Sequence, residues 1–269
     1  MKRLPRYVLL AALAVAVNYP FLWMLGTSLK SLRAATEPTL VFWPEQWQWE
    51  NYAEMFQAAP FGRYFFNTFV VAGAVTCAVT ASSLMAAYAF ARLQFPGRHL
   101  LFAAVLATTL IPFEAVLIPN FVFISRLGWY NTYAALIVPW CASAFSIFLL
   151  RQAFLQLPRD YYDAARLDGC GHLRFLVYVA APAVRPAAIT VALFAFLATY
   201  NALLWPLVVT GTENMRVVQV GLAAFSGAGG VRVNLLMCAA ALVMAPTVLL
   251  YFLAQRYFEE GFAGAGLKQ

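Results

Sequence analysis

The residues best equipped for chemistry lie in one polar segment, YYDAARLDGCGHLRF, at positions 161–175. It carries the carboxylates of Asp163 and Asp168, the thiol of Cys170 and the imidazole of His172. The two aspartates are five residues apart, which places them about 140° apart around a helix, so they do not converge on one substrate. His172 has no carboxylate or cysteine at nucleophile or metal spacing, and Cys170 has no identifiable base. Catalysis is therefore the least favoured of three interpretations, the others being a docking surface and a plain connector between helices.

The sequence also lacks the motif that would bind and hydrolyse ATP. A P-loop requires G-x-x-x-x-G-K-[ST], and the nearest segment, GTSLKS at positions 26–31, has Leu29 where the second glycine must stand. The four cysteines show neither metal-ligand nor disulfide spacing. We expect no catalytic residue, no metal site and no cofactor on this chain.

The composition indicates which solvent surrounds the elements that hold this segment. Hydrophobic residues make up 63% of the 269 residues and charged residues 11%, and the mean hydropathy is +0.73. A soluble domain is about one quarter charged, so the lipid bilayer is the expected environment. The net charge of +7 comes from basic residues that flank apolar segments. They form no stripe with interleaved aromatics, which argues against nucleic acid as a partner.

Six segments have the length and apolar character of a membrane-spanning helix. The sequence therefore predicts an all-α integral membrane protein with six transmembrane helices. We expect the first segment to stay uncleaved, because its apolar run continues to Leu25 and exceeds the length of a signal-peptide core. The six predicted spans lie near residues 7–29, 66–91, 100–124, 132–150, 187–209 and 235–257.

The basic residues predict the orientation of these spans. Of the 18 Lys and Arg residues, 12 fall on the side that includes the N-terminus and 6 on the other. Because Lys and Arg accumulate in cytoplasmic loops, we expect both termini and the polar segment in the cytoplasm. One outer loop, residues 31–63, carries Trp43, Trp47 and Trp49, which suit the membrane interface. The sequence shows no internal repeat.

The polar segment has its own helix signals. Pro158 disfavours helix at the residue before it and should end the fourth span. Asp160 is the expected N-cap of a short helix over about 160–168, with Asp163 three positions later in a capping-box-like arrangement. Gly169 is the expected stop, and a second short helix should start near His172. The face predicted for close contact with a partner carries Tyr161, Ala164, Ala165 and Asp168.

Four residues within or near the spans are candidates for the substrate pathway. Glu114 lies near the outer end of the third span, where an ionisable side chain suggests either function or simple capping. Tyr200, Asn201 and Trp205 in the fifth span offer hydrogen-bonding and stacking groups suited to a sugar. The alternative for these three is ordinary helix packing.

The polar segment resembles the "EAA" loop of binding-protein-dependent ABC importer permeases, with the pattern E-A-A-x-x-D-G-A, a later Phe and a later Pro. Asp163 stands where the family usually has Glu, and Cys170 where it has Ala. The segments AAYAFARLQFPGR (86–98), IPFEAVLIPNF (111–121) and QRYFEEGFAGAGLK (255–268) also resemble the carbohydrate branch, the second subunit of maltose and glycerol-3-phosphate permeases. The matching loop positions are Asp163, Ala164, Ala165, Asp168, Gly169, Cys170, Phe175 and Pro182.

The resemblance implies a type I ABC importer permease fold, one permease domain over residues 1–269 with a core of about 66–257 and a cytoplasmic coupling loop of about 151–186. It implies an inner-membrane sugar importer with a second permease subunit, in a heterodimer, and two ATPase subunits that hold ATP and Mg²⁺. An external solute-binding protein would contact the glycine-rich tip, Ser226, Gly227, Ala228, Gly229 and Gly230. The alternative is a self-sufficient secondary transporter or channel, but the spans carry few of the charges that ion coupling needs.

Overall fold

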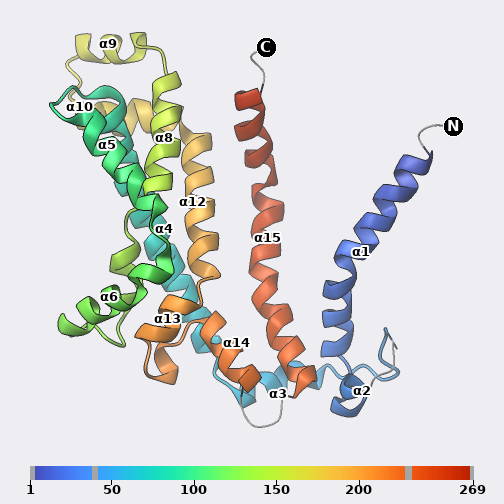
Figure 1. Cartoon of the computed structure of the whole chain (residues 1–269). Coiled ribbons are helices and arrows are strands. Elements are labelled where there is room, and N and C mark those ends of the chain that lie inside the picture. The colour runs from blue at the N-terminus through green and yellow to red at the C-terminus, as the bar shows by residue number, and fades with distance from the viewer. Residues whose placement is uncertain (1–3, 38–41, 228–231, 267–269) are drawn as a thin grey trace. The chain divides into compact units, whose positions relative to one another are not determined.

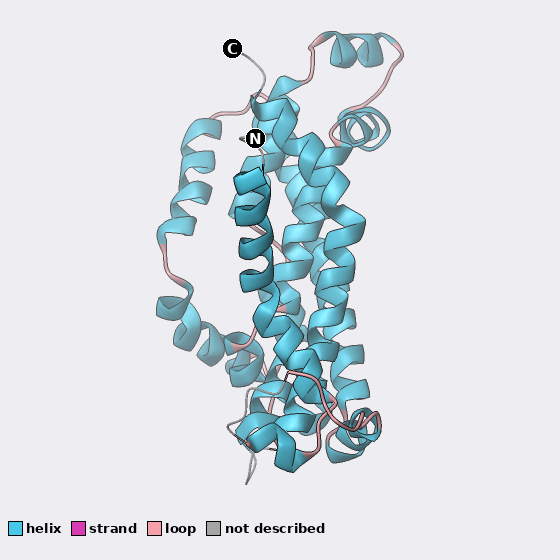
Figure 2. Cartoon of the chain, turned by 90° about the vertical axis from the view of Figure 1, so that its right-hand side faces the viewer, coloured by secondary structure: helices cyan, strands magenta, loops and turns pink. Residues whose placement is uncertain are grey.

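The computed structural model describes residues 4–37, 42–227 and 232–266. These residues form helices joined by turns and loops, and none of them is in a strand (Figure 2). The all-α prediction is therefore confirmed. Residue contacts divide the chain into two compact units, the first with residues 1–65 and 217–249 and the second with residues 66–216 and 250–269. The assignment of residues 1–269 to a single permease domain stays a prediction.

The first unit is built from α1, α2, α3, the start of α4, α14 and the first part of α15. Met55, Phe61 and Tyr64 are fully buried in its core. Gly221 lies against the ring of Tyr64, and an added Cβ there would be 2.2 Å from a ring carbon, so only glycine allows this close approach. The bounds are α1 (Leu4–Ser28), α2 (Leu32–Thr36), α3 (Glu50–Ala58), α4 (Phe61–Arg92), α14 (Val218–Gly227) and α15 (Val233–Gly266) (Figure 1).

A buried amide closes the C-terminal end of α1. The Nδ2 of Asn51 donates hydrogen bonds to the carbonyl oxygens of Ser28, at 2.9 Å, and Lys30, at 2.8 Å. Its Oδ1 accepts from the Nδ2 of Asn234 at 3.0 Å. Because the last carbonyls of a helix have no partner within it, Asn51 satisfies them and ties α1 to α3 and α15.

The first unit also carries a run of aromatic rings, here called the aromatic ladder. It begins on α1, most of whose large apolar side chains are exposed, as suits a helix that faces lipid or another subunit. Successive ring centroids lie 5.1 to 6.3 Å apart, and the last three rings are exposed tryptophans. The ladder consists of Tyr19, Trp23, Phe42, Trp43, Trp47 and Trp49.

The second unit contains the rest of α4 and the chain from α5 to η4. Within it α8 contacts both α5 and α12. Its elements are α5 (Arg98–Ala107), η1 (Thr108–Leu110), α6 (Phe113–Arg126), α7 (Tyr133–Ile137), η2 (Val138–Trp140), α8 (Ala144–Gln156), α9 (Asp160–Leu167), α10 (His172–Phe175), the π-helical η3 (Leu176–Ala180), α11 (Ala181–Ala183), α12 (Arg185–Tyr200), α13 (Leu204–Val209) and η4 (Glu213–Met215).

The predicted spans are only partly continuous helices. By length and composition, residues 6–28, 61–92 and 233–255 could each cross a membrane as one helix. Three further pairs pass the same test together but are bent, Arg98–Leu110 with Phe113–Arg126 by 99°, Tyr133–Trp140 with Ala144–Gln156 by 42°, and His172–Ala183 with Arg185–Tyr200 by 85°. The described residues therefore hold three spans, or up to six if each bent pair counts as one.

Prolines and caps explain the breaks that the sequence prediction missed. The third predicted span is interrupted because Ile111 precedes Pro112 and adopts an extended backbone, with φ −84° and ψ 116°. The fourth is interrupted before Ser143, which is extended and accepts a hydrogen bond from the N–H of Ser146 at 3.2 Å as the N-cap of α8. The fifth was expected as one helix over 187–209, but α12 ends at Tyr200 and α13 starts at Leu204.

Candidate functional site

The first part of the polar segment lies in α9. The N-cap of this helix is one residue earlier than the sequence suggested. Leu157 is extended before Pro158 and ends α8, as predicted. The N-cap of α9 is Arg159 and makes no side-chain cap hydrogen bond. The prediction of Asp160 as N-cap is therefore wrong, because it is already the first helical residue. Asp160 and Asp163 both lie in the first turn, where their carboxylates favour the positive end of the helix dipole.

The C-terminal end of α9 is closed by the backbone. The N–H of Cys170 donates to the carbonyl of Ala165 at 2.9 Å, and the N–H of Gly169 donates to that of Arg166 at 3.0 Å. Gly169 has φ +73°, so this is the Schellman arrangement with glycine in the left-handed conformation. The prediction of Gly169 as the helix stop is confirmed.

One face of α9 is turned to solvent, and we call it the outer face of α9. It consists of Asp160, Asp163, Ala164 and Leu167, which follow the i, i+3, i+4, i+7 spacing and are all exposed. Leu167 is 90% exposed, an unusual position for a large apolar side chain in a polar helix. In the described part of the chain neither aspartate makes an ion pair. This face combines two carboxylates, a small residue and an apolar knob.

The predicted contact face overlaps this outer face only in part, and its role in contact with a partner stays a prediction. Ala164 belongs to the outer face, but Ala165 lies on the half-buried side and Tyr161 and Asp168 lie at the edge. Leu167 was missed, because a leucine in a short helix normally indicates the core side. Among the other predicted loop residues, Cys170 is half-buried and Pro182 is exposed in α11.

The opposite side of α9 packs on a cluster of rings, here called the Tyr162 cluster: Tyr88, Tyr162, His172 and Phe175. The Tyr162 ring stacks on His172, with centroids 5.8 Å apart and planes 17° apart, and meets Phe175 edge-on at 5.2 Å. Tyr88 of α4 contacts the same two rings at 6.3 and 6.0 Å. Phe175, predicted as a loop residue, is buried. The cluster joins α9 and α10 to α4.

Two arginines join α4 to α8 beneath this cluster. The Nη2 of Arg92, the last residue of α4, donates to the carbonyls of Phe154 at 2.8 Å and Leu157 at 2.5 Å. In return the Nε of Arg151 on α8 donates to the carbonyl of Phe90 on α4 at 3.3 Å. An arginine on each helix thus donates to carbonyls near the end of the other helix.

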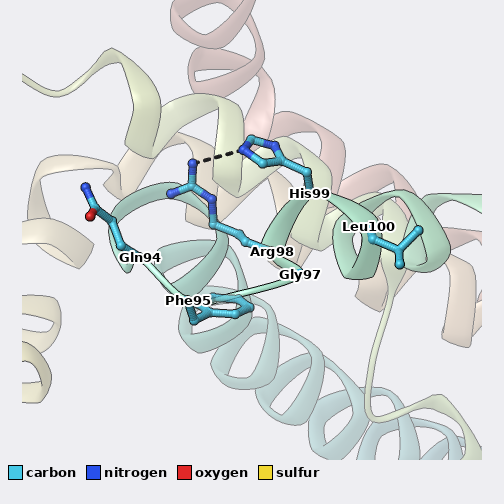
Figure 3. A pocket seen from close by; sticks show the side chains of 6 residues that line it. All are labelled: Gln94, Phe95, Gly97, Arg98, His99 and Leu100. Carbon is cyan, nitrogen blue, oxygen red and sulfur yellow. Dashed lines mark hydrogen bonds between the residues drawn. The ribbon is translucent and has the colours of Figure 1, made fainter.

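The turn between α4 and α5 forms an open surface pocket of about 440 Å³ (Figure 3). The Nη1 of Arg98 donates to the carbonyl of Leu93 at 3.0 Å, and its Nη2 lies 3.4 Å from the Nε2 of His99 (Figure 3). No residue predicted to contact substrate or a partner lines this pocket.

Comparison with known proteins shows the family to which the chain belongs. The model of the family described as "Binding-protein-dependent transport system inner membrane component" matches residues 78–264. This chain belongs to that family. It is a permease subunit of an ABC importer and a multi-pass membrane protein, and the family resemblance seen in the sequence is confirmed.

Relatives of the permease align along most of its length. A trehalose/maltose transport system permease protein of Thermococcus litoralis is 32% identical, over 100% of this chain and 98% of that protein. A diacetylchitobiose uptake system permease protein of Streptomyces coelicolor is 33% identical, over 93% and 84%. An sn-glycerol-3-phosphate transport system permease protein of Yersinia enterocolitica is 32% identical, over 83% and 82%.

The fold of the permease is also found in a solved structure. It matches a chain from the crystal structure of a bacterial ABC transporter involved in the import of the acidic polysaccharide alginate. The TM-score is 0.87, with 22% sequence identity and 95% of each chain covered. This match shows that the helices follow the fold of an ABC importer permease.

Two of the substrate-pathway candidates are packed inside the permease. Trp205 is 2% exposed, and its indole N–H, its one hydrogen-bond donor, donates to the carbonyl of Ala135 at 2.9 Å. Tyr200 is buried and stacks on Phe196 with centroids 5.8 Å apart. These placements support the packing interpretation for both residues.

The other two candidates are more accessible. Asn201 is exposed at the C-cap of α12, and its Nδ2 donates to the carbonyl of Leu197 at 2.9 Å. Glu114 is exposed in the first turn of α6, directly after the break at Pro112. The structure does not gather the four candidates into one described pocket, and their contact with substrate stays a prediction.

The predicted contact for the binding protein falls partly outside the described residues. Ser226 and Gly227 form the end of α14. Ala228, Gly229 and Gly230 lie outside the described ranges. The role of the five residues therefore stays a prediction.

Sequence reasoning missed two asparagines that organise the segment before residue 217. The Nδ2 of Asn67, a fully buried residue of α4, donates to the carbonyls of Asn214 and Arg216, both at 2.8 Å, and its Oδ1 accepts from the Tyr133 hydroxyl at 2.6 Å. Asn131 has φ +62°, and its Oδ1 accepts from the N–H of Gly211 at 2.9 Å. The polar Asn67 within an apolar run was the available signal, since buried amides need partners.

Proposed function

We propose that this permease imports a sugar or related small polar solute as one of the two permease subunits of a heterodimer, and that separate ATPase subunits dock on α9. The observation that carries the proposal is the outer face of α9. It presents Leu167 and two carboxylates to solvent on a helix that stands at one end of the second unit, away from α6 and α13 (Figure 1). A site with an apolar knob and charges around it is typical of a protein–protein contact.

The dimensions and chemistry of α9 fit insertion into a cleft of another protein. Eight residues make a helix of about 12 Å. Ala164 leaves room for close approach on the face that carries Leu167, and Asp160 and Asp163 are available to pair with basic groups of the partner. ATP and Mg²⁺ would then be held by the partner, which agrees with the missing P-loop in this sequence.

For the topology we propose six spans, with each bent pair counted as one, and both termini in the cytoplasm. The distribution of the 18 basic residues, 12 to 6, supports this orientation. It places α9 in the cytoplasm and the segment that contains Ser226 and Gly227 outside, where a solute-binding protein would deliver the substrate. A reporter enzyme fused after Lys268 should give a signal if it is of a kind that is active in the cytoplasm, and none if it is of a kind that is active only outside.

For the substrate we propose a sugar, an oligosaccharide or a polyol phosphate. The support is that the relatives are named for trehalose and maltose, diacetylchitobiose, and glycerol-3-phosphate transport. Uptake of these compounds in labelled form by the assembled transporter would select among them.

The docking proposal is tested with two leucines that differ in position but not in type. Leu167 lies on the outer face of α9, and Leu173, 69% exposed, lies beyond the Gly169 stop on α10. We expect Leu167→Glu to reduce co-purification of the ATPase by about tenfold or more, as for a central interface residue, and Leu173→Glu to leave it unchanged. Full ATPase association with Leu167→Glu would overturn the proposal.

A further inference from the structure

Tyr162 joins α9 to neighbouring helices of the permease. In the part of the chain that the structure describes, the ring contacts and side-chain hydrogen bonds between α9 and other helices all come from Tyr162. At its C-terminal end α9 is followed by Gly169 and Gly171, which have no side chain to pack against the spanning helices. A partner that displaces α9 would therefore rotate the helix relative to the spanning helices if the contacts of Tyr162 were absent.

His172 continues this attachment to a spanning helix. Its Nδ1 lies 3.4 Å from the Tyr162 hydroxyl and 3.1 Å from the Tyr88 hydroxyl. With the ring proton on Nε2, Nδ1 can accept a hydrogen bond from either tyrosine. Tyr88 is buried on α4 and meets Phe154 of α8 edge-on at 6.0 Å. The contacts thus run without a gap from α9 through His172 to α4 and α8.

We propose that Tyr162 and His172 are positioning residues that transmit movement of α9 to α4 during the transport cycle. This inference rests on the proposed docking of the ATPase to α9. The binding surface and the transmitting contact lie on opposite sides of the same helix, because the outer face carries Leu167 and the inner side carries Tyr162. Binding of the ATPase and transmission of its movement should therefore be separable by mutation.

Adjacent tyrosines provide a matched pair for the test. Tyr162 is half-buried against His172, and Tyr161 is 53% exposed at the edge of α9. Nitroxide labels at Arg166→Cys and Gln94→Cys, both exposed positions, would be attached in a background with the four native cysteines replaced by serine. Pulsed electron paramagnetic resonance on the membrane-embedded transporter then reports the distance between α9 and the end of α4.

We expect a narrow distance distribution in the parent protein, in Tyr161→Ala, and in Tyr162→Phe, which keeps the stacked ring. Tyr162→Ala and His172→Ala should broaden it, while the ATPase still co-purifies. The transport assay uses whichever of labelled maltose, trehalose and diacetylchitobiose the wild type takes up. The amount transported per ATP hydrolysed should fall about tenfold in Tyr162→Ala, a size found for mutations along coupled contacts. Tyr162→Phe should keep the wild-type value of transport per ATP hydrolysed.

An unchanged distribution in Tyr162→Ala would overturn the inference. Loss of ATPase binding in Tyr162→Ala would also overturn it, because Tyr162 would then belong to the docking surface. These failures are distinct from failure of the proposed function, which would appear as normal ATPase binding in Leu167→Glu.

Discussion

Arg92 donates a hydrogen bond of 2.8 Å to the carbonyl oxygen of Phe154, so the last residue of α4 caps the last turn of α8. Arg92→Ala removes this bond and the bond to the carbonyl of Leu157, while the carbonyl of Phe154 keeps the N–H of Leu157 as a donor. We expect the free energy of unfolding to fall by about 1.5–3 kcal/mol, the range for hydrogen bonds to a charged group. Denaturant titration in detergent micelles measures it.

The matched control for Arg92 is Arg159→Ala. Arg159 is exposed and makes no salt bridge within the described residues. It should change the unfolding free energy far less. Equal destabilisation by both variants would show that Arg92 acts through net charge and not through the two carbonyls.

The same substitution to alanine should have different effects at Gly169 and at Gly171. Gly169 has φ +73° and ends α9, whereas Gly171 has φ −76°, which any residue adopts. Gly169→Ala should cost about 1–2 kcal/mol of local stability, because a Cβ strains the left-handed conformation. Amide hydrogen exchange of residues 160–168 should accelerate in Gly169→Ala and stay unchanged in Gly171→Ala. Equal protection in the two variants would contradict the assigned helix stop.

Asn67 is expected to hold the segment at residues 211–216. Asn67→Ala removes the amide donor from the carbonyls of Asn214 and Arg216, at a cost of about 0.5–1.5 kcal/mol for each hydrogen bond. Tyr133→Phe removes only the hydroxyl donor to Asn67 and should have a smaller effect. Hydrogen exchange over residues 211–217 distinguishes the two, and a larger effect of Tyr133→Phe would exclude this assignment.

The aromatic ladder is expected to lie at the membrane interface. Trp43, Trp47 and Trp49 are exposed and joined through ring contacts to α1, and tryptophan favours the headgroup region. The triple substitution of these tryptophans by Phe identifies their share of the protein fluorescence. Lipids brominated near the headgroup should quench that share. Quenching by aqueous iodide alone would place the ladder in water.

Much of this architecture follows from the sequence because the bilayer limits the choices. Apolar runs of about 20 residues must be helical, so the regions of α1, α4 and α15 were predicted. The end of α8 before Pro158 and the stop at Gly169 follow from local backbone sterics.

The remaining features depend on contacts between distant residues. The bend at Ile111–Pro112 is a local exception, which proline sterics cause but the apolar pattern alone does not reveal. The hydrogen bond from Trp205 to Ala135 spans 70 residues in the chain. The exposure of Leu167 is also beyond the sequence pattern, because periodicity does not say whether a leucine faces the protein body or solvent.

Photo-crosslinking from position 167 is the most direct test of the central claim, that the outer face of α9 docks the ATPase. Benzoylphenylalanine would replace Leu167 on α9 or, as the control, Ile118 of α6, which is 71% exposed. We predict a covalent product between the permease and its ATPase from position 167 and none from position 118. Failure of position 167 to capture the ATPase in a transporter that still hydrolyses ATP would contradict the account.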